Sequence, residues 1–576
     1  MAASGPIRSE QPTRLMVFGV LALVLALRIL QLSSAAQSPL TYQPGPDEDY
    51  YWRFGQAVAA GHGADSPEFT FMDPLYGYLL GAVIKVAGVN PFAVYLLQVL
   101  LDTATAFGVL VIGRLLGQAR AGLYGALLYG LTSTAILFTT TLLKETCVAS
   151  FITWWVAGAL ALLRRERGLA WFAFGVYCGI GVALRSTLLA LAAMALLLPF
   201  VEAGQGAPGR RWRSWGRSAG PLALGLLLAM LPWSLRNWQA GDGLSPLPHN
   251  GGVVLHQIYN ADNPGATIWI PPFVNYSHPS EIWRGYAAEA ERRAGHALSA
   301  SQVDRYWRDQ ALAYLAQQPG VVLRGWVRKA LAFWSATEIP NNRSAAEERL
   351  FSPVLAALPA PATWLLALGL TGLAWFVLAD RRWPVLAAPV AIALLTMAAF
   401  WAEDRFRSHV LPILALGSGL FIAGVLGHAR EMPPRRLAAF AALAVCIAVG
   451  SLVLGRLNPA PAVRWDHVVW GYIKMGRIPE ARQLAQRIAT EQPDNGPIVE
   501  ALAYTASAGG QYGEAAAELE RAIALRPRSH VAHYNLARAY LALGRREDAA
   551  REAQTALGLH PSPDYQDLVR QAEAPP

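Results

Sequence analysis

The stretch LMVFGVLALVLALRILQLSSA, residues 15–35, is long and apolar enough to cross a lipid bilayer. A spanning helix needs about 20 predominantly apolar residues. The length of this run, the arginine at position 28 within it and the apolar runs that follow predict a retained anchor rather than a cleaved signal peptide. The stretch therefore predicts a membrane protein whose first span lies here.

The composition of the whole chain supports the same class. Of 576 residues, 54% are hydrophobic and only 15% are charged, whereas soluble proteins are about a quarter charged. The net charge of +9 could suggest nucleic acid, but Lys and Arg occur in short clusters between apolar runs, so we expect no nucleic-acid partner. Cys147, Cys178 and Cys446 all lie in apolar runs, which argues against a disulfide framework or a thiolate metal site.

Apolar runs that are long enough to span, or nearly so, recur along the first 455 residues. We therefore predict an all-α polytopic fold with about eleven transmembrane helices. The run at 74–88 is shorter and contains Lys85, so it predicts a helix that lies along the membrane surface. The predicted spans are 15–35, 93–113, 121–141, 146–163, 169–184, 186–201, 219–235, 354–379, 383–401, 409–427 and 436–455.

Basic clusters orient these spans, because cytoplasmic loops are enriched in Lys and Arg. Arg8 and Arg14 precede the first span, which places the N-terminus in the cytoplasm. Alternation then puts every strongly basic loop on the cytoplasmic side. Those loops contain Arg114 with Arg120, RRER at 164–167, RRWRSWGR at 210–217, Arg381 with Arg382, and HAREMPPRR at 428–436. The loops 37–92 and 236–350, and everything after about residue 455, are then predicted to lie outside.

The last 113 residues differ from the rest, because they are polar and repeat with a period of 34. Three columns carry the repeat: Gly476, Gly510 and Gly544; Ala481, Ala515 and Ala549; Pro493, Pro527 and Pro561. This is the tetratricopeptide pattern of paired helices. We predict a membrane domain at 1–455, a linker at 456–463 and a repeat domain at 464–576, which either binds a protein partner or supports assembly.

PGPDEDYYWRFG, residues 44–55, follows the first span with three adjacent acids. By geometry alone it is a good helix start, with Asp47 as N-cap and Glu48 and Asp49 complementing the helix dipole. A carboxylate at a membrane interface is also partly desolvated, which raises its pKa and suits it to act as a base. The two roles are compatible.

Six cations are predicted at outer membrane boundaries, where the charge rule disfavours them: Arg28, Lys144, Arg185, Arg236, Arg405 and Arg407. Each alone is explained by snorkelling of a long side chain to the interface. Together near a carboxylate they suit an anionic lipid phosphate. Glu145 is predicted to pair with its neighbour Lys144. The outer loop at 234–269 is rich in Gly, Asn and Pro and suits carbohydrate; its histidines lack metal-ligand spacing.

These motifs, in this order, resemble the membrane glycosyltransferases of the GT-C superfamily, nearest to bacterial protein O-mannosyltransferase, aminoarabinose transferase and Rgt-type relatives. The resemblance covers about residues 14–430. It is carried by PDEDYYWRFGQAVAAG (46–61), DPLYGYLLGAVIKVAG (73–88), LLKETCVASFITWWVAGALALLRR (142–165), ALRSTLLALAAMALLL (183–198), LPWSLRNW (231–238) and EDRFRSHVLPILAL (403–416).

The resemblance implies an inverting transfer of one sugar from a polyprenyl-phosphate donor to an acceptor on the outer face of the bacterial inner membrane. Asp47 would be the general base, and Glu48 would support it or orient the acceptor. Asp49 adds a third acid, so the choice of base among the three neighbours stays open. Arg185, Arg405 and Arg407, then Arg236 and Lys144, would bind the phosphate. Tyr51 is a further candidate substrate contact, and Asp73 is a candidate second acid, because it stands where relatives often have proline. The lipid-linked sugar is a co-substrate; no cofactor is implied, and a divalent metal is left open.

Two other functions remain compatible with the sequence. One is an O-antigen-type ligase or polymerase that uses lipid-pyrophosphate glycans, since some of these carry such repeats. The other is a non-catalytic membrane scaffold that presents the repeats to an envelope assembly. A polypeptide is weakly favoured as the acceptor or partner of the repeat domain, and the identity of the sugar is open.

Overall fold

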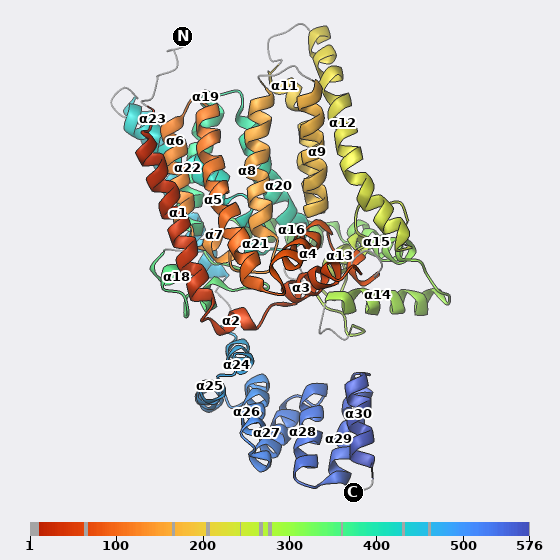
Figure 1. The fold of residues 1–576 in the computed structure, drawn as a ribbon. Helices are drawn as coiled ribbons and strands as arrows, with labels where there is room; N and C mark the ends of the chain where they lie inside the picture. Colours follow the sequence, from red (N-terminus) through yellow and green to blue (C-terminus); the bar gives the residue numbers. More distant parts are fainter. Residues whose placement is uncertain are drawn as a thin grey trace. The chain divides into compact units, whose positions relative to one another are not determined.

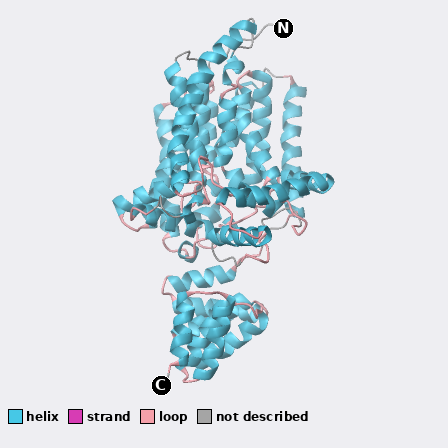
Figure 2. Ribbon diagram, turned by 90° about the vertical axis from the view of Figure 1, so that its right-hand side faces the viewer, coloured by secondary structure: helices cyan, strands magenta, loops and turns pink. Residues whose placement is uncertain are grey.

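The structure is a computed structural model, and it describes residues 11–62, 67–163, 168–202, 208–241, 243–263, 269–274, 279–358, 361–428, 433–458 and 462–574. The basic cluster predicted at 164–167 lies outside these ranges. All regular structure in the described residues is helical, as Figure 2 shows, and no strand occurs among them. The predicted all-α class is confirmed.

The chain divides into two compact units. Unit 1 contains residues 1–34 and 45–461, and unit 2 contains residues 35–44 together with 462–576. The short segment before the acidic cluster is thus grouped with the C-terminal repeats, although more than 400 residues separate them in the sequence.

Unit 1 holds the apolar helices and the long connecting loops. In chain order its elements are α1 (Arg14–Ala35), α3 (Pro46–Ala59), η1 (Pro67–Thr70), α4 (Leu75–Ala87), α5 (Pro91–Leu115), α6 (Ala119–Gly130), α7 (Ser133–Phe138), α8 (Glu145–Leu162), α9 (Gly168–Leu184), η2 (Ser186–Leu188), α10 (Leu189–Ala195), α11 (Leu198–Glu202), α12 (Pro208–Gln239), α13 (Gly251–Ile258), α14 (Pro279–Ala294), α15 (Ala300–Gln317), α16 (Pro319–Phe333), α17 (Ala345–Glu348), α18 (Pro353–Ala357), α19 (Pro361–Ala379), α20 (Trp383–Ala399), α21 (Asp404–Ser408), α22 (Leu411–His428) and α23 (Pro434–Leu457).

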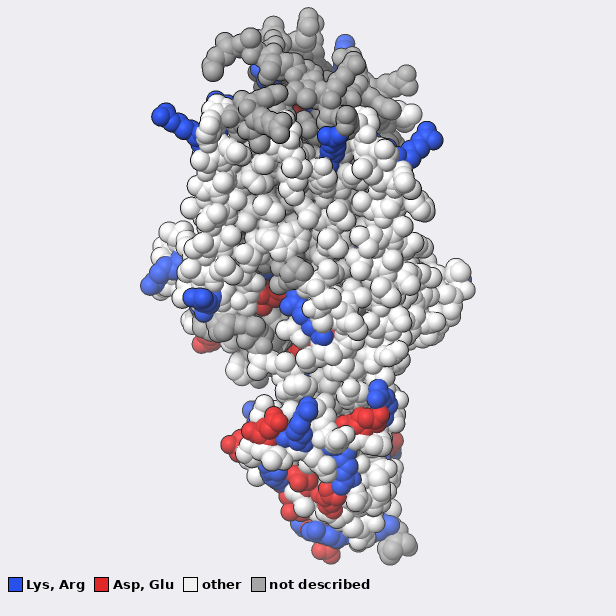
Figure 3. Space-filling view, turned by 90° about the vertical axis from the view of Figure 1, so that its left-hand side faces the viewer, with Lys and Arg blue, Asp and Glu red and all other residues white. Residues whose placement is uncertain are grey.

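Five helices of the described residues are long and apolar enough to cross a membrane: α1, α5, α8, residues 215–239 of α12, and α23. Shorter apolar helices accompany them, and Figure 1 shows α1, α5, α8, α9 and α12 running in roughly the same direction through unit 1. On the face drawn in Figure 3, a broad band of unit 1 carries almost no charged atoms. This arrangement suits a multi-pass membrane unit; the number of about eleven spans stays a prediction.

Three predicted spans are not single helices. The run at 121–141 ends as α6 at Gly130 and restarts as α7 at Ser133; the run at 186–201 consists of η2, α10 and α11; and the run at 354–379 is divided between α18 and α19. The first break has a visible cause, because Arg28 Nη1 donates a 2.5 Å hydrogen bond to the Gly130 carbonyl, and Thr132 Oγ1 donates to Leu128 O. Arg28 thus satisfies a carbonyl at the C-terminal end of α6.

Arg28 itself is placed differently from the prediction. It is fully buried, its Nε lies 2.7 Å from Asp102 of α5, and the Tyr129 hydroxyl of α6 donates to the same carboxylate. Arg28 therefore joins α1, α5 and α6. A charge this deeply buried persists only when it is paired and hydrogen-bonded, which is the case here.

α3 and α4 pack closely through glycine. A Cβ atom at Gly77 would lie 2.1 Å from the Phe54 ring, and one at Gly81 would lie 2.4 Å from Val58. Phe54 also stacks on Phe69, with ring centroids 4.8 Å apart. The pair places the acidic cluster at the start of α3 on a rigid support rather than on a free loop.

Unit 2 consists of α2 (Pro39–Tyr42), α24 (Trp465–Lys474), α25 (Ile478–Glu491), α26 (Gly496–Ala508), α27 (Tyr512–Leu525), α28 (His530–Ala542), α29 (Arg546–Leu559) and α30 (Pro563–Glu573). The three predicted turn glycines have φ of 75°, 75° and 78°, a backbone region that favours glycine. α2 packs on α24, where a Cβ atom at Gly471 would lie 2.1 Å from the Pro39 carbonyl oxygen.

Candidate active site

The acidic cluster begins α3, but one prediction about it is wrong. The N-cap is Gly45, Pro46 is the first helical residue, and Asp47 is the second. Proline suits this first position because its fixed φ matches the helix and its missing N–H has no helical partner there. The capping carboxylate is Glu48, which accepts a 2.8 Å hydrogen bond from the Gly45 N–H.

Glu48 is completely buried, and both of its carboxylate oxygens accept hydrogen bonds. Besides Gly45, it accepts from the Leu142 N–H at 3.0 Å and from Nε and Nη2 of Arg343 at 2.8 and 3.1 Å. Arg343 also pairs with Glu348 at 3.0 Å. The four donors leave Glu48 no free position for a substrate proton, and its contacts connect α3 to the segment that contains Arg343.

Asp47 faces a different environment. Its side chain is 16% exposed and lies 2.5 Å from Arg405 Nη1. Asn342 forms two hydrogen bonds with Asp47. Its Nδ2 donates to the carboxylate at 2.9 Å, and its Oδ1 accepts from the Asp47 N–H at 2.9 Å. Asp47 is therefore a positioned, partly accessible carboxylate beside a cation.

Two further ion pairs lie beside this one. Lys144 Nζ is 2.5 Å from Asp73, whose other oxygen accepts the Ser186 N–H at 3.0 Å. Arg185 Nη1 is 3.6 Å from Glu145. The prediction that Lys144 pairs with Glu145 is wrong, because the two neighbours at the start of α8 point to different partners.

The charges of these groups act on one another. Burial lowers the pKa of Arg185, and the nearby Arg405 lowers it further. Burial also lowers the pKa of Lys144, against the opposing effect of Asp73. His409 is buried, and the charges of Arg185, Arg405 and Lys144 all act on it. An anion placed among these cations would relieve their mutual repulsion.

Four buried polar atoms of this cluster have no hydrogen-bond partner among the described residues. They are the Tyr51 hydroxyl, Glu145 Oε2, Arg185 Nη1 and His409 Nε2. Leaving one buried polar atom unpaired costs about 1–3 kcal/mol. Each such atom therefore calls for an explanation, and four of them lie in this one cluster.

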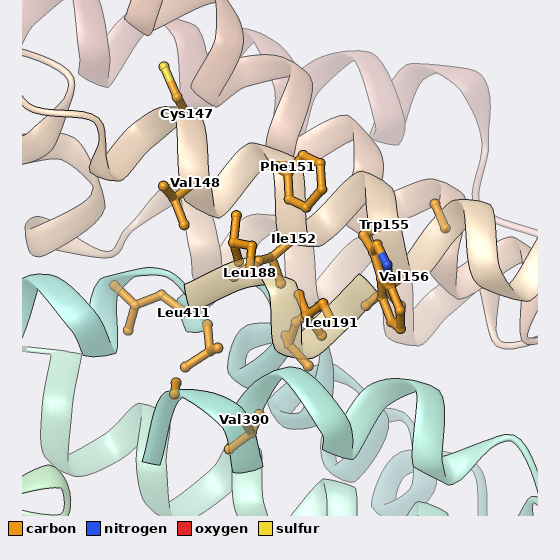
Figure 4. Packing of buried hydrophobic residues seen from close by; sticks show 14 of the residues in the cluster. Cys147, Val148, Phe151, Ile152, Trp155, Val156, Leu188, Leu191, Val390 and Leu411 are labelled. Atoms are coloured by element: carbon orange, nitrogen blue, oxygen red, sulfur yellow. The ribbon is translucent and has the colours of Figure 1, made fainter. Parts of the chain in front are cut away.

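A narrow cleft opens at Arg185 and His409. The remaining lining is largely aliphatic and comes from α8, η2, α10 and α20, with Ile152, Leu188, Leu191 and Ile392 among its residues. Figure 4 shows Ile152, Leu188 and Leu191 close together in the surrounding apolar packing. The lining thus combines the guanidinium of Arg185 and the imidazole of His409 with aliphatic side chains.

Two other predicted phosphate-binding residues, Arg407 and Arg236, form contacts elsewhere in unit 1. Arg407 is buried and holds the Ser335 carbonyl at 2.7 Å and Asp404 at 2.6 Å. Arg236 donates to the Phe69 carbonyl at 2.7 Å, and its guanidinium lies over the ring of Phe54. Through these hydrogen bonds and ion pairs, both arginines connect neighbouring segments of unit 1.

Three residues of the site were not singled out from the sequence: Asn342, Arg343 and His409. The first two lie in PNNRSAAEE, 340–348, where an Asn-Asn-Arg run in an outer loop is the only local signal. No group of three or more His, Cys, Asp or Glu residues that could hold a metal ion occurs in the described part of the chain.

Comparison with known proteins now identifies the class to which this site is similar. Residues 65–234 match the family of dolichyl-phosphate-mannose-protein mannosyltransferases, and residues 506–572 match the tetratricopeptide repeat. The first match includes Asp73, Lys144 and Arg185 and does not reach Asp47 or Arg405. The predicted resemblance and the predicted repeats are confirmed over these stretches.

The relatives are sugar transferases. The undecaprenyl phosphate-alpha-4-amino-4-deoxy-L-arabinose arabinosyl transferase of Pseudomonas aeruginosa UCBPP-PA14 is 31% identical over 210 residues, which are 33% of this chain and 36% of the relative. The chain thus spans about a third of the length of the curated relatives that it matches.

Two solved structures are also similar. The oligosaccharyltransferase AglB from Archaeoglobus fulgidus, in complex with an inhibitory peptide and a dolichol-phosphate, has a TM-score of 0.41 and 15% identity, covering 79% of this chain and 58% of its own. ArnT from Cupriavidus metallidurans, bound to undecaprenyl phosphate, has a TM-score of 0.36 and 15% identity, covering 82% and 81%.

Proposed function

We propose that the protein is an inverting membrane glycosyltransferase that moves a sugar from a polyprenyl-phosphate donor to an acceptor on the outer face of the bacterial inner membrane. The carrying observation is the partly exposed carboxylate of Asp47 beside Arg405. Arg405 in turn influences Arg185 electrostatically. The matches to lipid-phosphate sugar transferases support the same reaction class.

In this proposal the donor phosphate lies among the cations Lys144, Arg185 and Arg405. Nη1 of Arg185, Nε2 of His409 and the Tyr51 hydroxyl, which have no hydrogen-bond partner among the described residues, supply hydrogen bonds. The lipid chain follows the aliphatic lining of the cleft. As the bond from the anomeric carbon to the phosphate oxygen breaks, charge grows on the phosphate, and fixed cations stabilise that charge without a proton donor.

Asp47 is the proposed base. In the absence of donor its carboxylate is held by Arg405. When the donor phosphate engages Arg405, the carboxylate gains a free lone pair and takes the proton of the acceptor hydroxyl. The acceptor oxygen attacks the anomeric carbon opposite the leaving phosphate, which inverts the configuration. Glu48 acts as a positioning residue, because it fixes the start of α3.

The test is transfer from a synthetic undecaprenyl-phosphate sugar by purified full-length protein in nanodiscs. General-base catalysis contributes about 10²–10⁴-fold to rates, so Asp47→Asn should lower turnover at least about 100-fold while the unfolding temperature stays near that of the wild type. Asp49→Asn is the matched control, because Asp49 pairs with exposed Arg53. Wild-type turnover by Asp47→Asn would overturn the assignment.

A donor comparison separates this function from its alternatives. Turnover of the lipid monophosphate sugar, and none of a lipid-pyrophosphate oligosaccharide, is expected. Use of the pyrophosphate alone would favour the ligase or polymerase, and the absence of released polyprenyl phosphate with either donor would favour the scaffold. The lipid-linked sugar is the co-substrate, and no cofactor is assigned.

The proposed topology has the N-terminus in the cytoplasm and unit 2 outside, where its repeats bind a protein partner or a polypeptide acceptor. The basic loops and the repeat match support this assignment. A thiol-reactive, membrane-impermeant label on Ser507→Cys in intact spheroplasts, in a background with Cys446→Ala, should react. Labelling only after lysis would place unit 2 inside.

A further inference from the structure

α16 presents an apolar face to the surroundings. Leu323, Trp326, Val327 and Leu331 are 62%, 43%, 51% and 44% exposed, and their spacing places them on one side of the helix. A soluble surface rarely exposes such a stripe, whereas a helix that lies in a membrane interface does.

A cavity of about 190 Å³ lies beside this stripe. Its lining includes Arg324, Arg328 and Lys329 of α16, together with Tyr259 and Asn263. Arg324 and Arg328 are four residues apart, so they share one face of the helix. No carboxylate lies within ion-pair distance of these three cations in the part of the chain that the structure describes.

The walls of the cavity are fixed in place. Lys329 is buried, donates to the Phe400 carbonyl at 2.6 Å and lies over the Tyr259 ring, and burial lowers its pKa to about 8. The Tyr259 hydroxyl donates to the Ala399 carbonyl and accepts from Trp326 Nε1 at 2.6 Å. α13, α16 and the end of α20 are thus tied together around the cavity.

We propose that this cavity binds the phosphate headgroup of an anionic phospholipid. Arg324 and Arg328 would hold the phosphate, and the acyl chains would lie along the apolar stripe of α16. A zwitterionic headgroup would bring its own cation against the two arginines and bind less well. The cavity shares no lining residue with the cleft at Arg185 and His409, so this site is separate from the proposed donor site.

The experiment measures retention of dioleoylphosphatidylglycerol by the purified full-length protein, using native mass spectrometry after exchange into mixed phosphatidylglycerol–phosphatidylcholine nanodiscs. Each surface cation contributes about 1 kcal/mol to binding an anionic lipid. Arg324→Gln/Arg328→Gln should therefore weaken phosphatidylglycerol binding by at least about tenfold. Arg305→Gln/Arg308→Gln removes equal charge from exposed positions of neighbouring α15 and should leave binding near the wild-type value.

Two results would overturn the proposal. One is equal loss of phosphatidylglycerol binding in both double variants, which would indicate a nonspecific charge effect. The other is displacement of phosphatidylglycerol from wild type by stoichiometric undecaprenyl phosphate, which would make the cavity a carrier-lipid site. Because lipid retention needs no sugar transfer, these outcomes do not depend on the proposed reaction. Unchanged circular dichroism verifies the fold of both variants.

Discussion

Replacing Glu48 by glutamine tests whether the second acid of the cluster is structural. The substitution removes a buried charge that accepts four hydrogen bonds and places an amide NH2 group against donors from Leu142 and Arg343. Breaking a buried ion pair costs about 3–5 kcal/mol. Since Glu348 still faces Arg343 at 3.0 Å, we expect the lower end, about 3 kcal/mol.

The measurement is thermal unfolding followed by tryptophan fluorescence in detergent. Glu48 lies in unit 1, which covers residues 1–34 and 45–461. An unfolding entropy of about 2.1 cal/mol/K per residue then gives a shift in unfolding temperature of about 1 °C per kcal/mol, so a fall of about 3 °C is expected for Glu48→Gln. Asp49→Asn, in a pair whose side chains are 33% and 59% exposed, should shift the unfolding temperature by less than about 1 °C.

A double-mutant cycle with Arg343→Gln sharpens the test. If Glu48 and Arg343 stabilise the fold through each other, the double variant should lose clearly less than the sum of the two single losses. A Glu48→Gln variant with wild-type unfolding temperature and no turnover would refute the reasoning. It would show that Glu48 takes part in catalysis and that its contacts do not stabilise the fold.

Three further outcomes follow from particular contacts. Burial lowers the pKa of His256 from 6.5 to about 4, so unfolding takes up a proton at any pH between 4 and 6.5. The free energy of unfolding should therefore fall by up to about 3 kcal/mol as the pH drops from about 6.5 to about 4. His256→Gln should flatten that part of a plot of unfolding free energy against pH. Gly471→Leu should destabilise unit 2 by about 1–3 kcal/mol and speed hydrogen exchange around Pro39, whereas Gly558→Leu, with open space at its Cβ, should not. His409→Leu should weaken undecaprenyl phosphate binding in a calorimetric titration by about tenfold, and His409→Gln, which keeps an N–H donor, by much less.

The sequence predicted the uninterrupted helices well. α1, α8 and α23 lie within two residues of their predicted bounds, because long apolar runs between polar ends have no other way to satisfy their backbone in a membrane. The run at 121–141 has the same composition, yet it breaks at Gly130. At this break Arg28, about 100 positions away in the sequence, donates a hydrogen bond to the Gly130 carbonyl. The hydropathy of the run itself does not predict this contact.

The site was predictable in its residue types but not in its pairs. Unusual cations near an acidic loop predicted an anion site, which stays a prediction. The charges of Lys144, Arg185 and Arg405 all act on one group, His409. Which acid each cation meets depends on side-chain direction. Lys144 and Glu145 are adjacent in sequence, but the first reaches Asp73 and the second faces Arg185.

The same geometry favours Asp47 over Glu48 as the proposed base. Successive residues of a helix point about 100° apart, because 3.6 residues make one turn. Glu48 therefore turns into the protein toward Arg343, while Asp47 turns toward Arg405 at the partly open side. A base must present a lone pair to the substrate, and four donors occupy those of Glu48. The assignment of the proton to Asp47 thus rests on the direction of one helix start, which Pro46 and the cap from Glu48 to Gly45 determine.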